Sequence, residues 1–236
     1  MKVVVKDIDS YSLSDLDVII WAQENHPNLY DHLNSLGRLE VLDVGCGIPL
    51  VSFFAYHIFS CSEITLVDIH SEKECIKNEL NNGVLKQAPL GLGKAESFYD
   101  CYEKLPISGT DERPKIESKE VFDSIFIEHF EQEQIQTFVK SNPKKYDLVF
   151  VLNVFHFLGL EMESTLKGVF DLLTENGVLL IRVQRRDDLK GNQKFDYDLF
   201  KKTFNTCFKD GVIIEFYKDE RWDYSICMDR DLLSLQ

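Results

Sequence analysis

Residues 39–47 read LEVLDVGCG, and this stretch decides the fold. Six mainly apolar, β-favouring residues lead into two glycines, which is typical of a buried strand that ends in a tight turn. Pro49 then begins an apolar, helix-like stretch over residues 50–59. Glycine lets the backbone approach a ligand closely, and a helix after such a turn offers free N–H groups to an anion. The stretch therefore predicts a strand, a ligand-binding turn and a helix.

The rest of the chain alternates between strand-like and helix-like patterns in the same way. Alternation of this kind predicts an α/β fold, a three-layer, doubly wound, mainly parallel seven-stranded sheet. The predicted strands are 39–44, 64–67, 123–129, 146–152, 178–183, 212–217 and 224–228. The predicted helices are 16–22, 29–36, 50–59, 75–85, 132–140, 162–173 and 197–208, and Asn176-Gly177 closes the sixth of them.

We expect a single domain over residues 1–236. Residues 1–36 form an N-terminal helical segment in this prediction. Residues 87–120 have no regular period and contain several Pro and Gly, so they are expected to form an insertion or a lid.

The chain is acidic, with 40 Asp and Glu against 26 Lys and Arg, and a formal net charge of −14. Binding to phosphate backbones or anionic membranes needs a basic face. The one basic cluster, over residues 182–190, is interrupted by Asp187 and Asp188. We therefore expect neither nucleic acid nor a membrane as partner.

The six cysteines are irregularly spaced and form no metal-ligand pattern, so no metal is predicted. The apolar stretch after Met1 is too short for a signal peptide, and the longest apolar run, residues 48–61, is too short to span a bilayer. These features predict a reduced, cytoplasmic protein.

Three strand ends carry polar or glycine residues, and ligands bind at this edge of a parallel sheet. They are the turn at 43–47, Asp68 after the second strand, and Asn153 after the fourth. Each has a plain structural alternative: a tight turn, a helix cap, and, for His156 nearby, a hydrogen-bonded wall residue. Their joint occurrence in this order favours a ligand site.

The pattern VLDVGCG at 41–47 resembles the first motif of class I S-adenosylmethionine-dependent methyltransferases. LVDI at 66–69 is similar to the second motif of that family, and YDLVFVLNVFHFL at 146–158 to its fourth-strand motif. LLTENGVLLI at 172–181 is similar to the helix, glycine turn and fifth strand of the same family. The resemblance covers about 150 residues, 37–183, and implies S-adenosyl-L-methionine as cofactor.

The resemblance also implies roles for individual residues. Asp68 binds the ribose hydroxyls and Ile69 lies against the adenine, while Glu131 is the candidate for the adenine amino group. The methionine carboxylate lies near the amides of the turn, and the ammonium near Asp43 and the Asn153 backbone. The full cofactor set is Asp43, Gly45, Cys46, Gly47, Asp68, Ile69, Glu131, Asn153 and Val154.

Two departures from known patterns bear on this interpretation. Pro49 stands where the family usually has a third glycine, although proline suits the first turn of a helix. A dinucleotide-binding turn would need Gly or Ala where this chain has Leu50, which disfavours a nicotinamide oxidoreductase.

Methyl transfer from a sulfonium is an in-line displacement, so the protein must mainly hold acceptor and methyl group in line. An acceptor that must lose a proton also needs a base. His156 is the catalytic candidate, with His70 and His129 as alternatives.

We expect a small-molecule acceptor, neutral or cationic because the chain and the 87–120 insertion are acidic. A protein methyltransferase and a catalytically silent binding or scaffold domain remain as alternatives. The sequence leaves the oligomeric state open.

Overall fold

The computed structural model describes a large part of the chain, including most of the predicted sheet. The described residues are 27–47, 49, 51–52, 55–56, 59, 61–69, 129–152, 154–155, 158, 161–183, 197–207, 211–217 and 223–229. The predicted helices at 16–22 and 75–85 and the insertion at 87–120 lie outside these residues.

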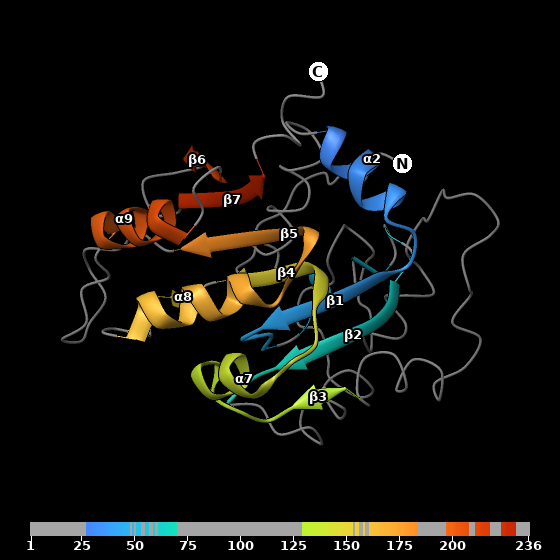
Figure 1. Cartoon of the computed structure of the whole chain (residues 1–236), viewed down its shortest axis with the longest axis horizontal. Coiled ribbons are helices and arrows are strands. Elements are labelled where there is room, and N and C mark those ends of the chain that lie inside the picture. Colours follow the sequence, from blue (N-terminus) through green and yellow to red (C-terminus); the bar gives the residue numbers. More distant parts are fainter. Residues whose placement is uncertain are drawn as a thin grey trace, which may run out of the picture.

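The strands form one sheet in the order β3-β2-β1-β4-β5-β7-β6 (Figure 1). The strands β3, β2, β1, β4 and β5 are parallel, whereas β7 is antiparallel to both β5 and β6. Their bounds are β1 Leu39–Val44, β2 Cys61–Val67, β3 Phe130–Glu131, β4 Tyr146–Leu152, β5 Leu173–Val183, β6 Gly211–Tyr217 and β7 Asp223–Asp229. The predicted α/β class with a parallel sheet is confirmed.

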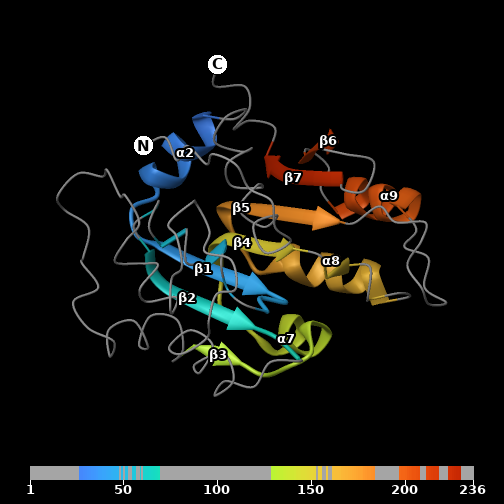
Figure 2. The same cartoon turned by 180° about the vertical axis from the view of Figure 1, so that it is seen from behind.

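Three helices cover one face of the sheet, as the front and back views show (Figures 1 and 2). They are α7 Ile135–Ser141, α8 Met162–Asp171 and α9 Tyr197–Cys207. Alternate residues of the central strands point to these helices and form the main apolar core with them. Residues such as Val149, Val151 and Phe200 are fully buried there. This core fixes the strand ends that carry the candidate site.

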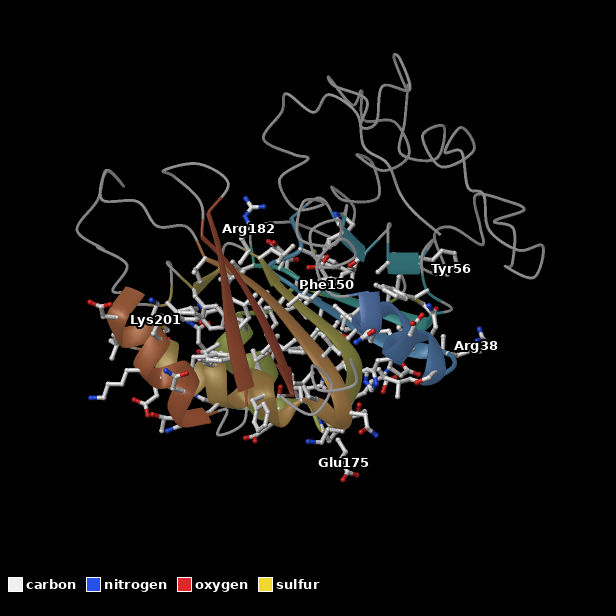
Figure 3. All side chains as sticks on the ribbon, turned by 90° about the horizontal axis from the view of Figure 1, so that it is seen from above. Arg38, Tyr56, Phe150, Glu175, Arg182 and Lys201 are labelled. Carbon is white, nitrogen blue, oxygen red and sulfur yellow. The ribbon has the colours of Figure 1, made fainter. Side chains whose placement is uncertain are left out.

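The intervening strand residues point to the opposite face. Asp43, Phe150 and Arg182 lie on that side because their neighbours in sequence belong to the core under α7, α8 and α9. Figure 3 shows Arg182 on the side of the sheet away from α9. Arg182, the first residue of the basic cluster at 182–190, is fully buried and therefore adds no charge to an exposed basic surface.

The helix α2, Pro27–Ser35, lies at the end of the sheet where the parallel strands begin (Figure 1). Its side chains Leu29 and Leu33 are buried. The His32 ring nitrogen Nε2 is 2.8 Å from the carbonyl oxygen of Asn176. The helix overlaps the predicted one at 29–36 but begins at Pro27 and ends at Ser35, and the rest of the predicted N-terminal helical segment lies outside the described residues.

Gly177 has a role different from the predicted one. The helix α8 ends at Asp171, so Asn176-Gly177 does not close it. The pairing of β4 with β5 shifts between Tyr146↔Leu173 and Leu148↔Val178, so residues 174–177 bulge from the ladder. A Cβ on Gly177 would lie 2.9 Å from the carbonyl oxygen of Tyr146, which explains the glycine.

Two element boundaries differ from the prediction. Of the predicted strand at 123–129, residues 123–128 lie outside the described residues. The structure has β3 at Phe130–Glu131, directly after His129, where it pairs with Leu66 and Val67 of β2. The helix α7 begins three residues later than predicted, since Gln134 has an extended backbone.

Two searches of the described residues had negative results. No helix in this part of the chain is long and apolar enough to cross a membrane. The same residues contain no group of three His, Cys, Asp or Glu side chains that could hold a metal ion.

Candidate functional site

The turn after β1 is built by two glycines with left-handed backbone angles. Gly45 has φ +67° and Gly47 has φ +48°, which other residues adopt only at a cost. The N–H groups of Gly45 and Cys46 both donate to the carbonyl oxygen of Val67, at 2.7 and 3.2 Å. The turn therefore folds back over the end of β2.

Asp68 follows directly after β2 and meets this turn. The N–H of Gly47 donates to Asp68 Oδ2 at 2.9 Å. The N–H of Asp68 donates in turn to the carbonyl oxygen of Glu131, at 3.3 Å. The ends of β1, β2 and β3 are thus joined through Gly47, Asp68 and Glu131, three residues that the sequence assigned to one site.

The amides of the turn donate hydrogen bonds within the protein. The free N–H groups that the sequence predicts belong to the helix after the turn, of which only a part is described. The N–H groups of Gly45, Cys46 and Gly47 all donate to acceptors of the protein. The main contribution of the glycines is therefore shape. An anion that binds the N–H of Gly47 must replace the Asp68 carboxylate there.

Val154, two residues after the end of β4, packs against the turn. A Cβ on Gly45 would lie 2.3 Å from Val154 Cγ2, so only glycine fits at this contact. The structure thereby brings Val154 into the predicted site. Asn153, His156 and His70 lie outside the described residues.

The Asp43 carboxylate lies below the turn, within the protein. Asp43 is 2% exposed, and Ser52 Oγ donates to Asp43 Oδ2 at 2.6 Å. Ser52 was not among the residues that the sequence assigned to the site. The available signal was a serine between apolar residues, in the run of residues 48–61.

The pKa of the Cys46 thiol is raised by its surroundings in the turn. Burial raises the pKa of its thiol well above the ordinary value, and the negative charges of Asp43 and Asp68 raise the pKa further. Cys46 is therefore a neutral thiol at pH 7 and not a thiolate nucleophile. The same two carboxylates make the site attractive to a cation.

Within the described residues, one side of the site is open and partly apolar. A Cβ on Gly47 would meet no atom of these residues within 4 Å, and Ile69 is 46% exposed although it is a large apolar residue. Space beside a glycine, a carboxylate at Asp68 and an apolar side chain next to it fit a nucleoside, whose sugar is polar and whose base is flat and apolar.

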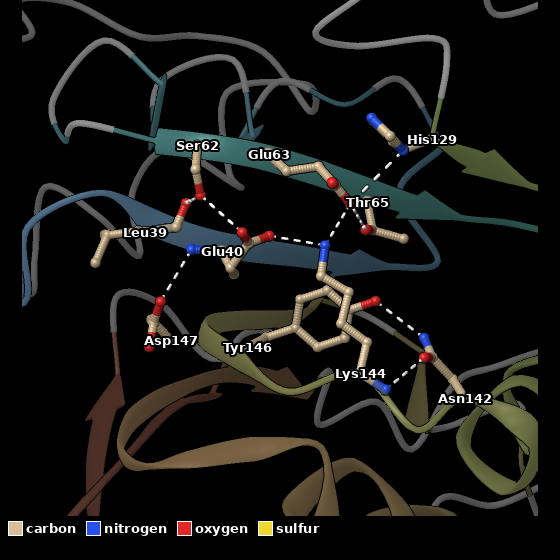
Figure 4. Close-up of polar contacts among 10 residues, drawn as sticks. All are labelled: Leu39, Glu40, Ser62, Glu63, Thr65, His129, Asn142, Lys144, Tyr146 and Asp147. Atoms are coloured by element: carbon tan, nitrogen blue, oxygen red, sulfur yellow. Dashed lines mark hydrogen bonds and ion pairs between the residues drawn. The ribbon is translucent and has the colours of Figure 1, made fainter.

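His129 lies beside β2, just before β3. Its carbonyl oxygen accepts the N–H of Leu66, two residues before Asp68, at 3.1 Å. Its ring is paired elsewhere, because Nδ1 lies 3.6 Å from Glu63 Oε1 (Figure 4). The role of His129 as an alternative base stays a prediction.

Comparison with known proteins agrees with this geometry. A family model described as a methyltransferase domain matches residues 21–222. No curated protein sequence matches the chain.

Solved structures with the same fold include methyltransferases at low sequence identity. The bifunctional kinase-methyltransferase WbdD is 16% identical, with a TM-score of 0.50 and 92% of this chain covered. An O-methyltransferase family protein from Burkholderia thailandensis is 10% identical, with a TM-score of 0.51 and 92% of this chain covered. The present chain spans only 39% and 59% of these two proteins, respectively.

The family match covers most of the chain, and the strand order, the glycine turn and Asp68 agree with it. The chain therefore belongs to the methyltransferase domain family, with the Rossmann-like fold of class I S-adenosylmethionine-dependent methyltransferases.

Proposed function

We propose that this protein transfers a methyl group from S-adenosylmethionine to a small, neutral or cationic acceptor. The observation that carries the proposal is the hydrogen bond of 2.9 Å from the Gly47 N–H to Asp68 Oδ2. It joins the glycine turn to the carboxylate at the next strand end, which is the arrangement that a nucleoside cofactor requires.

In this proposal, different described residues bind different parts of the cofactor. Asp68 accepts hydrogen bonds from the ribose hydroxyls, and Ile69 covers one face of the adenine. Glu131, at the exposed end of β3, is available for the adenine amino group. Gly47 leaves space for the cofactor beside the turn, and Val154 closes the site from the β4 side.

Charge supports the choice of acceptor class. Asp43 and Asp68 both act on Cys46 electrostatically, so their negative potential reaches the turn. This potential favours the ammonium group of the amino-acid part and a sulfonium cation, and it disfavours an anionic acceptor. The whole chain, at a net charge of −14, acts in the same direction.

When bound, the cofactor supplies an activated methyl group on sulfur. The protein then has to hold the acceptor in line, exclude water and, for a hydroxyl or ammonium acceptor, remove a proton. In our proposal His156 accepts that proton, and residues 1–36 and 87–120 shape the acceptor pocket.

The test is calorimetric titration of the full chain with S-adenosylhomocysteine, the demethylated cofactor. We expect binding by the wild type and a loss of about 100-fold in affinity for Asp68→Ala, since two hydrogen bonds to a carboxylate are lost. Asp171→Ala removes an exposed carboxylate on α8 and is the matched control. If the wild type binds no S-adenosylhomocysteine, the proposal is wrong and a silent scaffold domain is favoured.

The acceptor class is tested separately, by methylation of small-molecule and peptide mixtures with labelled S-adenosylmethionine. Label in small neutral or cationic compounds supports the proposal. Label only in peptides would instead assign the protein to the protein methyltransferases.

A further inference from the structure

Ser52 and Asp43 form a buried polar pair beneath the glycine turn. Ser52 is fully buried and Asp43 is 2% exposed, and the distance from Ser52 Oγ to Asp43 Oδ2 is 2.6 Å. Asp43 belongs to β1, whereas residues 51–52 and 55–56 are helical. The hydroxyl therefore ties the first helix after the turn to the strand before it.

This pair is arranged on the face of the sheet opposite to the main core. Asp43 pairs in register with Leu66 of β2 and Phe150 of β4, both fully buried. Val51 and Ala55, the buried helical neighbours of Ser52, are apolar. A carboxylate in such surroundings is costly unless charge-assisted hydrogen bonds hold it.

The charge of Asp43 acts beyond its own hydrogen bonds. Together with burial and with Asp68, it raises the pKa of the Cys46 thiol in the middle of the turn. A carboxylate that is buried, fixed in orientation and electrostatically coupled to the turn is well placed to attract a cationic group of a ligand there.

We propose that Ser52 is a positioning residue that fixes the Asp43 carboxylate for recognition of the ammonium group of the cofactor. This inference rests on the proposed function and adds a residue to its site. Ser52 itself does not contact the cofactor in this proposal, because it is fully buried beneath Asp43.

Two ligands separate this role from a purely structural one. S-adenosylhomocysteine carries the amino-acid part, whereas 5′-methylthioadenosine keeps the nucleoside and the sulfur but lacks it. Calorimetry on the full chain gives the dissociation constants of both ligands for the wild type, Ser52→Ala and Ser52→Thr. Thr165→Ala, which removes a fully buried hydroxyl from α8, is the matched control.

We expect Ser52→Ala to weaken S-adenosylhomocysteine about tenfold, as for the loss of one charge-assisted hydrogen bond, and 5′-methylthioadenosine less than about twofold. Ser52→Thr keeps the hydroxyl and restores the affinity. In an Asp43→Asn background, Ser52→Ala has no further effect on the ratio of the two affinities. Thr165→Ala leaves both affinities unchanged.

Loss of one donor to a buried carboxylate can weaken folding, so Ser52→Cys is the second variant. It keeps the size of the side chain but is a weak donor, and we expect about a threefold loss for S-adenosylhomocysteine alone. Equal losses for both ligands, no loss in a folded variant, or a full effect in the Asp43→Asn background would each overturn the positioning role. Failure of the wild type to bind either ligand would overturn the proposed function itself.

Discussion

Gly47 donates its backbone N–H to Asp68 Oδ2 at 2.9 Å. The carboxylate that follows β2 therefore holds the glycine turn that follows β1. Asp68 thus has two tasks in the proposed site, to hold the turn and to bind the ribose. The two tasks have different chemical requirements. An uncharged oxygen can accept the bond from Gly47, whereas two ribose hydroxyls favour a full carboxylate.

Replacement of Asp68 by Asn therefore separates the two tasks. Asp68→Asn keeps an oxygen for the Gly47 N–H and should lower the free energy of unfolding by less than about 1 kcal/mol. We expect its affinity for S-adenosylhomocysteine to fall about tenfold, less than for Asp68→Ala. Urea unfolding and calorimetry measure the two effects. A strongly destabilised Asp68→Asn variant that still binds would contradict the division of tasks.

The contact between Gly45 and Val154 gives a second prediction. A Cβ on Gly45 would lie 2.3 Å from Val154 Cγ2, and the φ of +67° adds backbone strain. We expect Gly45→Ala to destabilise the protein by about 3 kcal/mol, from overpacking together with strain. Urea unfolding measures the loss, and S-adenosylhomocysteine binding should fall with it.

Two further variants separate the clash from the strain. Val154→Ala removes Cγ2, so Gly45→Ala in that background should cost only about 1–2 kcal/mol, the strain alone. Gly47→Ala should cost a similar amount, because a Cβ there meets no atom of the residues that the structure describes within 4 Å. Equal losses for Gly45→Ala in both backgrounds would show that Val154 is not the obstacle.

The strands and the glycine turn were predictable because their signals are local. The strands β1 and β4 have the predicted bounds, Leu39–Val44 and Tyr146–Leu152, since a strand buried on both faces is a mainly apolar run of β-favouring residues. The turn and Asp68 were predictable because glycines and an acid at strand ends follow from the topology of a parallel sheet.

Contacts between distant residues were not predictable in this way. Nothing in the sequence around Gly177 shows that a Cβ there would lie 2.9 Å from the carbonyl oxygen of Tyr146, so the glycine was assigned to a helix end. Ser52 was missed for the same reason, because the sequence does not show that its hydroxyl lies beside the Asp43 carboxylate.

A polar cluster at the other end of the sheet was missed as well, and it provides a prediction about pH. Lys144 forms ion pairs with Glu40, at 2.7 Å, and with Glu63, as Figure 4 shows. Burial by itself raises the pKa of Glu63, but the hydrogen bond and charge of Lys144 outweigh it, and the net pKa lies below the ordinary 4.5. Burial likewise lowers the pKa of Lys144, but bonds to Glu40 and Glu63 outweigh it, and the net pKa lies above 10.5.

The signs of these shifts define a pH window. A lowered pKa at Glu63 stabilises the fold above pH 4.5, and this contribution is lost as the pH falls through the folded-state pKa. A raised pKa at Lys144 stabilises the fold below pH 10.5, and this contribution is lost as the pH rises through the folded-state pKa. The ion pairs therefore contribute fully between these two limits.

Lys144→Met should accordingly lower the free energy of unfolding by about 1 kcal/mol at pH 7, a modest value because the three side chains are partly exposed. The deficit should shrink when urea unfolding is repeated below pH 4. Lys167→Met breaks an exposed pair with Glu163 on α8 and serves as control, with little change expected at either pH. A deficit for Lys144→Met that is independent of pH would assign the effect to packing against Tyr146 instead.

Thr165 on α8 gives the last prediction, in which a substitution raises the free energy of unfolding. Its side chain is 1% exposed, and within the part of the chain that the structure describes its Oγ1 has no hydrogen-bond partner. A buried hydroxyl in that state costs about 1–3 kcal/mol relative to an apolar group of the same shape. We therefore expect Thr165→Val to raise the free energy of unfolding by about 1 kcal/mol in urea titrations. Thr206→Val, whose exposed hydroxyl donates to the carbonyl of Lys202 at 2.8 Å, should show no gain. A loss of stability in Thr165→Val would mean that this hydroxyl is bonded in solution, and that α8 depends on a polar contact at its buried face.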